Sequence, residues 1–203
     1  MLEPNLTSQQ FGSVRCFDAD QEIFLQGQLA DVFFKVLDGT VRGCRYFSDG
    51  KRQVDRFYRS GDIFGFEIDG AYPFTAEAVN PCALTVISAR EVRQMAAIDQ
   101  HLAWQLMSNA MTGMRRAVNH ATVLSRRNAV QKVAAFLIEW AGDGDGGNSI
   151  LLPMTHSDVA DYLNLTVETI SRSIAKLEQE GLIRLQSPKR INIVNFDALE
   201  ALI

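Results

Sequence analysis

Four side chains near the C-terminus have types and a spacing suited to reading DNA bases. Val167, Glu168, Ser171 and Arg172 belong to the segment TVETISR at residues 166–172. On a helix, Glu168 and Arg172 lie one turn apart, on a face that also carries Ser171. Arginine donates to guanine, glutamate accepts from the amino group of cytosine, and hydroxyl or small apolar side chains suit thymine. The segment therefore predicts base contacts by these four residues.

The same charged pair also allows a purely structural interpretation. Glu168 would lie near the start of a helix, where the helix dipole favours a negative charge, and Arg172 would be its partner one turn later. The turn before the segment and the hairpin after it favour the base-reading interpretation.

The elements that position these residues begin with two helices. Thr155 or Ser157 can cap the first helix, and residues 164–166 form a tight turn. Thr166 then caps a second helix, which extends to about Gln179. Two helices joined in this way are typical of a helix-turn-helix unit.

A hairpin follows the two helices. Residues 182–185 and 190–194 have the composition of strands, and the four residues Gln-Ser-Pro-Lys separate them. Before the unit, residues 129–141 form an amphipathic helix. Together these elements predict a winged helix-turn-helix domain over residues 126–203.

The charge of the chain does not by itself indicate a nucleic-acid partner. The whole chain has a formal net charge of −4, and residues 126–203 hold eight Lys or Arg against ten Asp or Glu. Phosphate binding needs clustered cations rather than a basic total, and such a cluster occurs toward the C-terminus. The predicted phosphate contacts are Thr166, Thr169, Lys176, Lys189 and Arg190.

Over residues 91–125 the hydrophobic period changes, and from Trp104 onward apolar residues recur at the alternating steps of three and four that are typical of a long helix. This seam consists of Trp104, Met107, Met111, Met114, Val118 and Ala121. Such a seam needs a partner. The polar flanks favour a second copy of the chain, so residues 99–125 are predicted as the dimerisation helix of a homodimer. Packing of this helix on its own N-terminal domain is the alternative.

The first part of the chain alternates short runs of branched and aromatic residues with turns. The predicted strands are Glu22–Leu25, Val32–Leu37, Thr40–Tyr46 and Val54–Tyr58. Several short strands at this spacing predict a small antiparallel barrel or sandwich over residues 1–98. The fold class is therefore α+β, with an N-terminal antiparallel β-barrel, a long helix and a C-terminal winged helix-turn-helix.

No metal, cofactor or catalytic site is predicted. Cys16, Cys44 and Cys82 are widely spaced and odd in number, which predicts free thiols, buried or half-buried, rather than disulfides or a metal knot. Residues 143–148 superficially resemble a calcium loop but lack the required glutamate, so a flexible turn is expected. No nucleophile, base and orienting group recur near one another, which argues against an enzyme.

The composition also limits where the protein acts. Its apolar fraction of 47% is that of a folded globular protein. The N-terminus lacks the apolar run of a signal peptide, and the chain lacks a membrane span. We expect a cytoplasmic protein with no membrane partner.

Four separated motifs carry a family resemblance. They are VLDGTV at 36–41, SGDIFG at 60–65, the long helix and TVETISR at 166–172. With these motifs in this order, the chain resembles the CRP/FNR superfamily of bacterial transcription regulators over almost all of its length. The VETISR sequence is similar to the FNR-like version, and FGFE at 64–67 with FTAEA at 74–78 is similar to the FixK branch.

The resemblance implies a function and a fold. It implies a cyclic-nucleotide-binding-like jelly roll for the barrel, and a homodimer that binds a palindrome of the form TTGAT, spacer, ATCAA. It also implies an activator of low-oxygen metabolism genes. By analogy with activating loops of the family, the turn that carries Asp49, Lys51 and Arg52 would contact RNA polymerase. An ordinary solvated turn is the alternative for these three residues.

The resemblance bears on effectors as well. Phe74 stands where cyclic-nucleotide-binding members carry the phosphate-binding arginine, and Glu67 is shifted by one residue from the ribose-binding place. An iron–sulfur cluster needs four thiolates, and the chain has three cysteines. We therefore expect regulation without cAMP or a cluster. The alternative is a barrel that senses haem-bound gas, another small molecule or redox state.

Overall fold

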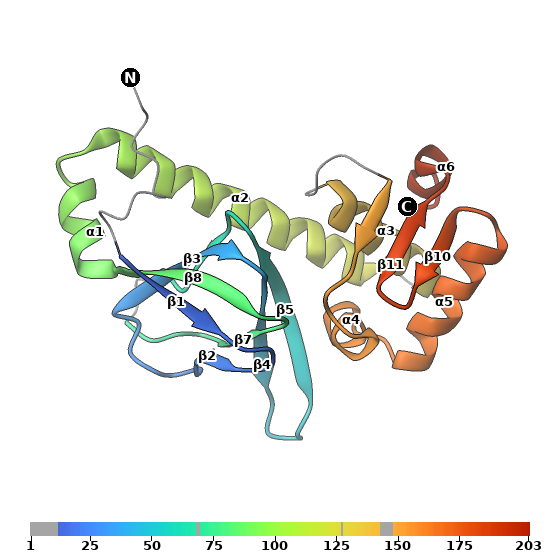
Figure 1. Cartoon of the computed structure of the whole chain (residues 1–203), viewed down its shortest axis with the longest axis horizontal. Coiled ribbons are helices and arrows are strands. Elements are labelled where there is room, and N and C mark those ends of the chain that lie inside the picture. Colours follow the sequence, from blue (N-terminus) through green and yellow to red (C-terminus); the bar gives the residue numbers. More distant parts are fainter. Residues whose placement is uncertain (1–11, 68–69, 127, 143–147) are drawn as a thin grey trace. The chain divides into compact units, whose positions relative to one another are not determined.

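The computed structural model describes residues 12–67, 70–126, 128–142 and 148–203. The chain forms two compact units, Met1–Arg115 and Arg116–Ile203, and the division between them falls within helix α2 (Figure 1). The predicted boundaries at 98/99 and 125/126 stay predictions. Most of the turn predicted at 143–148 lies outside the described residues.

The N-terminal unit contains two four-stranded antiparallel sheets, with strand orders β1-β8-β3-β6 and β2-β7-β4-β5. The strands are β1 (Ser13–Phe17), β2 (Glu22–Phe24), β3 (Val32–Asp38), β4 (Thr40–Tyr46), β5 (Arg52–Arg59), β6 (Ile63–Phe64), β7 (Thr75–Ala78) and β8 (Cys82–Ser88). The predicted antiparallel barrel and its four strands are confirmed. The sequence interpretation did not name β1, β6, β7 and β8.

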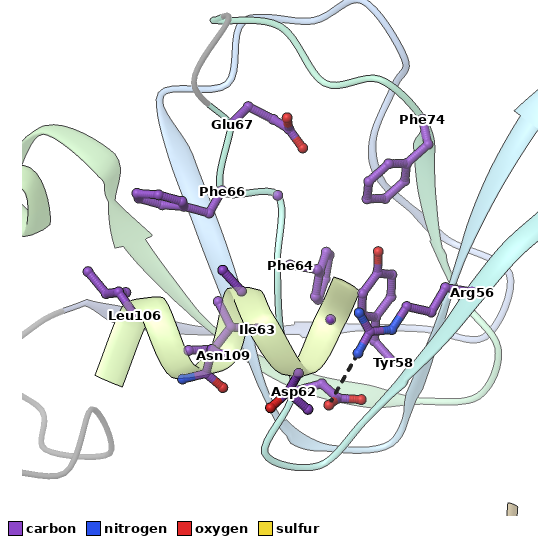
Figure 2. Close-up of a pocket in the computed structure, with 14 residues that line it drawn as sticks. Arg56, Tyr58, Asp62, Ile63, Phe64, Phe66, Glu67, Phe74, Leu106 and Asn109 are labelled. Carbon is purple, nitrogen blue, oxygen red and sulfur yellow. Dashed lines mark ion pairs between the residues drawn. The ribbon is translucent and has the colours of Figure 1, made fainter. Parts of the chain in front are cut away.

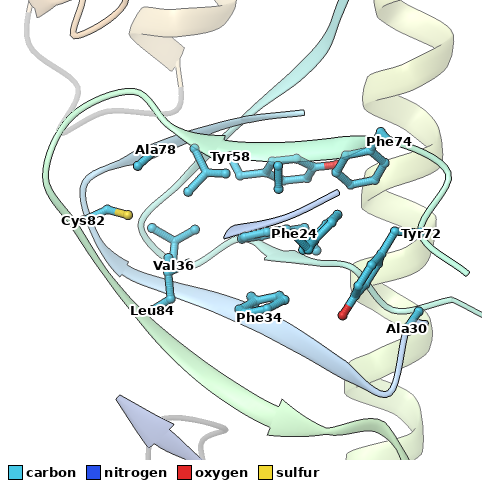
Figure 3. Close-up of a cluster of buried hydrophobic side chains, with 13 residues drawn as sticks. Phe24, Ala30, Phe34, Val36, Tyr58, Tyr72, Phe74, Ala78, Cys82 and Leu84 are labelled. Carbon is cyan, nitrogen blue, oxygen red and sulfur yellow. The ribbon is translucent and has the colours of Figure 1, made fainter. Parts of the chain in front are cut away.

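Aromatic side chains fill the space between the two sheets. Figure 3 shows Phe24 between Phe34 on one side and Tyr58 on the other. The rings of Phe24 and Tyr72 stack with centroids 3.7 Å apart. The Tyr72 hydroxyl donates to the carbonyl of Val32 at 2.6 Å, so the buried phenol keeps a partner. The packed rings hold the two sheets of the barrel together.

The turn between β3 and β4 requires glycine. Gly39 has φ +86°, and a Cβ there would lie 2.5 Å from the Cβ of Cys82 on β8. A side chain is excluded both by this close approach and by the left-handed backbone. The Asp38-Gly39 turn predicted from the sequence is therefore confirmed.

Two helices follow β8, and the second covers the residues expected for the long helix. Helix α1 is Ala89–Ala96 and α2 is Gln100–Ser125. The Asp99 carboxylate accepts from the backbone N–H groups of His101 and Leu102, at 2.9 and 3.1 Å. This cap starts α2 at residue 100.

The C-terminal unit contains a helix-turn-helix and a small three-stranded sheet of order β10-β11-β9. Its elements are α3 (Ala129–Gly142), β9 (Ser149–Leu151), α4 (His156–Leu163), α5 (Val167–Gln179), β10 (Ile183–Ser187), β11 (Arg190–Ile193) and α6 (Phe196–Glu200). The predicted winged helix-turn-helix is confirmed. The strand β9 and the helix α6 were not predicted.

The three cysteines are free thiols. Cys44 and Cys82 are buried, as expected, but Cys16 is exposed, which corrects the expectation that all three are buried or half-buried. Cys16 lies on β1, which pairs with β8 and is an edge strand of the first sheet among the described residues. No helix in the described part of the chain is long and apolar enough to cross a membrane.

Candidate nucleic-acid interface

Helix α4 begins with a capping box. The Thr155 hydroxyl accepts from the Asp158 backbone N–H at 3.1 Å, and the Asp158 carboxylate accepts from the Thr155 backbone N–H at 3.0 Å. The sequence allowed Thr155 or Ser157 as the cap, and the structure has Thr155. Two backbone donors at the start of the helix are satisfied in this way, which fixes where α4 begins.

The turn between α4 and α5 depends on a left-handed residue and a buried lysine. Asn164 has φ 52° and ψ 56°, and its N–H donates to the carbonyl of Ala160. The buried Lys132 of α3 donates from Nζ to the carbonyl of Leu163 at 3.3 Å. A cation at the end of a helix complements the helix dipole. The sequence interpretation missed Lys132, although a lysine within an otherwise apolar helix face was a signal.

Helix α5 has one buried face and one exposed face. Ile170, Ile174 and Leu177 are buried in the unit. The four predicted base-contacting residues, Val167, Glu168, Ser171 and Arg172, are exposed on this helix. Helical periodicity thus separates the two faces as the sequence predicted.

The start of α5 is held by threonines that were predicted to contact phosphates. The Thr166 hydroxyl accepts from the Thr169 backbone N–H at 3.2 Å, and the two hydroxyls lie 3.1 Å apart. Thr166 is therefore the N-cap of the helix, as the sequence predicted. The phosphate contacts of both threonines stay predictions.

The charged pair on α5 is ordered by local bonds. Arg172 donates from Nε to the backbone carbonyl of Glu168 at 3.3 Å. The backbone N–H of Glu168 and the Thr166 hydroxyl, together with the nearby charge of Arg172, lower the pKa of the Glu168 carboxyl. Glu168 is thus ionised at neutral pH and available as an acceptor.

Helices α4 and α5 also meet through polar side chains. The Ser171 hydroxyl lies 3.4 Å from Nδ1 of His156, the first residue of α4. His156 is partly buried and Ser171 is exposed. The sequence interpretation did not connect these two residues, because they are 15 positions apart.

The hairpin is hydrogen-bonded to α5 and to the segment that precedes α4. The backbone N–H of Leu185 on β10 donates to Glu178 of α5 at 2.8 Å. Lys189 donates from Nζ to the carbonyl of Pro153, just before α4, at 3.4 Å. Arg190 is exposed, and Lys176 lies 3.9 Å from Glu180 on α5. All three cations are exposed, and their phosphate contacts stay predictions.

The predicted seam of α2 is open to solvent in the single chain. Its large residues Trp104, Met107, Met111, Met114 and Val118 are between 46% and 64% exposed. Ala121 is exposed as well. Large apolar side chains that recur along one helix and stay exposed are typical of a surface covered by a partner.

Two protein families match the chain, one in each part. The Cyclic nucleotide-binding domain matches residues 14–99, and the Crp-like helix-turn-helix domain matches residues 131–202. The nitrogen fixation regulation protein FixK of Rhizobium meliloti strain 1021 is 38% identical over 93% of this chain and 86% of its own length. The chain belongs to the FixK-like branch of the CRP/FNR superfamily of transcription regulators.

Further similarities extend over most of this FixK-like chain. The FixK of Azorhizobium caulinodans is 35% identical over 94% of the chain and 79% of its own length. The solved structure of FixK2 from Bradyrhizobium japonicum has a TM-score of 0.90 and 30% identity, over 94% of this chain and 96% of that one. These relatives are transcription regulators rather than enzymes. The FixK-like chain is accordingly a regulator with a DNA-binding helix-turn-helix.

The barrel of this FixK-like regulator has a cavity of about 220 Å³ against the first part of α2 (Figure 2). Phe74 lines it. Arg56 of β5 lines it too, lies 3.7 Å from Asp62 and stacks over the Tyr58 ring at 4.8 Å. The segment around Phe74 supplies no cation, but β5, on the other side of β4 in the same sheet, supplies Arg56. This arginine was missed because β5 is distant in sequence.

Two further features bear on the sequence predictions. In the β4–β5 turn, Lys51 donates from its backbone N–H and from Nζ to Asp49, each at 3.1 Å, and Arg52 begins β5. The polymerase contact of this turn stays a prediction.

Among residues 12–67, 70–126, 128–142 and 148–203, no three His, Cys, Asp or Glu side chains are grouped so as to hold a metal ion.

Proposed function

We propose that this chain is a homodimeric transcription activator that binds a palindrome of the form TTGAT, spacer, ATCAA and controls low-oxygen metabolism genes. The observation that carries the proposal is the exposed row of Val167, Glu168, Ser171 and Arg172 on α5, held between a capped turn and a wing. Arginine suits guanine, glutamate suits cytosine, and serine with valine suits thymine. A TTGAT half-site and its complementary strand contain the bases that these four side chains suit.

The homodimer is supported by the α2 seam. A self-paired helix would cover the exposed Trp, Met and Val side chains, and methionines give an adaptable interface. A symmetric dimer reads two half-sites about 34 Å apart, which accounts for a palindrome. The hairpin turn with Asp49, Lys51 and Arg52 would contact RNA polymerase in the cytoplasm.

Independence from cyclic nucleotides and from an iron–sulfur cluster is part of the proposal. Phe74 occupies the cavity wall, and Arg56 is already paired with Asp62. Cys44 and Cys82 are buried on the barrel strands, whereas Cys16 is exposed, and three thiols are fewer than the four that a cluster needs. Abundance of the regulator, rather than a ligand, would then set its activity.

Selection of binding sites from random double-stranded DNA tests the proposal. The full chain, without added effector, should enrich TTGAT half-sites in inverted pairs at one fixed spacing. The matched control is Arg172→Ala, which should lose the guanine preference while it keeps general DNA affinity. Enrichment of no sequence, or of one unrelated to TTGAT, would contradict the proposal.

An effector-gated regulator is the second candidate, and the cavity with Arg56 favours it. A cation among aromatic rings suits a small planar anion. An absorption spectrum of the freshly purified protein, followed by a DNA titration, separates the two candidates. A haem or cluster band, or DNA binding that is lost after exhaustive dialysis, would favour the gated regulator. A bare protein spectrum with full DNA binding would favour the first candidate.

A further inference from the structure

The C-terminal part of α2 belongs to the same compact unit as the helix-turn-helix. This unit spans Arg116–Ile203, so it contains α5 together with the last two residues of the seam, Val118 and Ala121. Both of these seam residues are exposed. A contact that holds this part of α2 against the helix-turn-helix therefore also fixes where the end of the seam lies relative to α5.

Such a contact joins His120 of α2 to Tyr162 of α4. The two rings stack with their centroids 3.9 Å apart and their planes inclined by 18°. His120 is partly buried, and Tyr162 is only 5% exposed. His120 lies between Val118 and Ala121 in sequence, but helical periodicity places it on a different face of α2. The imidazole therefore packs on α4 while the seam stays exposed.

Tyr162 is held in place from a third helix. Its ring meets the ring of Phe136 on α3 edge to face, with the centroids 5.7 Å apart. Its hydroxyl donates to the Glu139 carboxylate, also on α3, at 3.5 Å. Aromatic pairs in such arrangements stabilise a structure beyond the area that they bury. The stack therefore joins α2 to a ring fixed in the interior of the unit.

The same tyrosine lies just before the turn that leads into α5. Leu163 ends α4, Asn164 has a left-handed backbone, and Thr166 caps α5. The carbonyl of Leu163 accepts from the buried Lys132 of α3. A continuous series of defined contacts thus runs from the seam, through the stack on Tyr162, to the start of the reading helix.

The spacing between two half-sites makes a geometric demand on a dimer. One base pair more or fewer moves the half-sites about 3.4 Å along the duplex and rotates them by about a tenth of a turn. In a dimer paired through α2, the reading helices follow this change only by moving relative to the seam. A contact between α2 and α4 that is strained or broken by this movement opposes it.

We propose that His120 is a positioning residue whose stack on Tyr162 sets the spacer length between the two half-sites of the palindrome. The inference rests on the proposed function, because it requires a homodimer that reads two half-sites. It assigns the choice of spacing to the contact between α2 and α4, and the choice of bases to the exposed row on α5. The two preferences should therefore change independently.

Site selection from random DNA with the full chain, scored by spacer length, tests the inference. The wild type should enrich inverted half-sites at one spacing. His120→Ala should enrich the same half-site sequence with a weaker preference for that spacing. Spacings one base pair longer or shorter should gain about two- to ten-fold relative to the favoured one, the ratio that corresponds to one aromatic pair. Gel shifts with synthetic palindromes of the three spacings measure the same ratios directly.

Matched variants separate positioning from a merely structural role. His120→Phe keeps a flat ring and should restore the wild-type spacing. Tyr162→Phe keeps its ring but loses the hydroxyl that bonds Glu139, and it should also keep the wild-type spacing. Asn119→Ala alters the exposed neighbour of His120 and should have no effect. Thermal unfolding checks that each variant is folded, and His120→Leu, which has no ring but more volume, replaces the alanine variant if that one is not.

The outcomes distinguish this inference from the proposed function. A folded His120→Ala protein with the spacing preference of the wild type would overturn the inference and leave the proposed function in place. A preference that His120→Phe does not restore, or an altered half-site sequence in His120→Ala, would also overturn the inference. Enrichment of no palindrome by the wild type would overturn both.

Discussion

Arg172 and Lys176 lie one turn apart on α5 and are both exposed, yet we expect them to contribute differently to DNA binding. Arg172 belongs to the base-reading row, whereas Lys176 is predicted to contact a phosphate. Arg172→Ala should therefore cost about 1–3 kcal/mol of binding to the selected palindrome and relax its guanine position. Lys176→Ala should weaken binding to all sequences alike and lower the salt slope by about one.

Gel-shift titrations of both variants at several salt concentrations measure these effects, with each variant as the control for the other. Wild-type affinity of Arg172→Ala for the palindrome would contradict the base-reading role. A sequence-dependent loss in Lys176→Ala would contradict its phosphate role.

The cysteines differ in their expected reactivity because the thiolate is the reactive form. Burial, with smaller contributions from Cys16 and Asp38, raises the pKa of Cys82 to about 11. Because this pKa is raised, Cys82 stays protonated as the pH increases from 7 to 9. A thiol reagent should therefore modify the exposed Cys16 rapidly over this range, and Cys44 and Cys82 only slowly. Cys16→Ser should remove the fast phase, and a fast phase that remains would show that a buried thiol is accessible.

At the scale of elements, the sequence predicted the strands and helices whose own residues show a strong hydrophobic pattern. The strands β3 to β5 alternate branched and aromatic residues, and α5 has both a threonine cap and a regular apolar face. The strand β7 has the sequence TAEA, and all four of its residues are buried. Alanine is depleted in strands, and uniform burial leaves no alternation to detect. Its conformation depends on its neighbours β2 and β4 rather than on local propensity.

The sequence alone did not predict the contacts that side chains of one helix or strand make with another. The exposed row on α5 follows from helical periodicity and was predicted in full. The contacts of Lys132 with Leu163 and of His156 with Ser171 join different helices. Arg56 reaches the barrel cavity in a similar way, from β5. Such contacts depend on how the helices or strands pack, for which one sequence gives no spacing rule.

The capping box of α4 allows a stability prediction with an internal control. Thr155→Ala removes the hydroxyl that bonds Asp158, so it should lower the free energy of unfolding by about 1 kcal/mol. Thr155→Ser keeps the hydroxyl and should be close to the wild type. Ser157→Ala alters the other residue that the sequence allowed as a cap, and it should have little effect. Denaturant unfolding followed by circular dichroism measures all three, and an equal loss in Ser157→Ala would contradict the assigned cap.

At the scale of the whole molecule, the order of barrel, long helix and winged helix-turn-helix follows from where the hydrophobic period changes along the chain. The period is two in the strands and close to 3.5 along α2. The long helix was expected from residue 99, and Asp99 is a good N-cap type whose carboxylate accepts from the backbone N–H of His101 at the start of α2. The short helix α1 before it was not named in the sequence interpretation.

The exposed seam of α2 gives the last prediction, which concerns the assembly. Met111 lies in the middle of the seam and is 59% exposed in the single chain. A charge buried between two paired helices is costly, so Met111→Asp should convert a dimer into a monomer. The monomer engages one half-site only and should bind the palindrome far more weakly, while each folded unit keeps its circular dichroism spectrum.

Asn119→Asp introduces the same charge on the same helix, but off the seam, and should leave both mass and affinity unchanged. Analytical ultracentrifugation and DNA titration measure the two variants together. A dimer held together by α2 would bury two facing carboxylates at its centre, which lowers the affinity between the chains. A Met111→Asp protein that sediments like the wild type would therefore show that the seam is not the dimer interface.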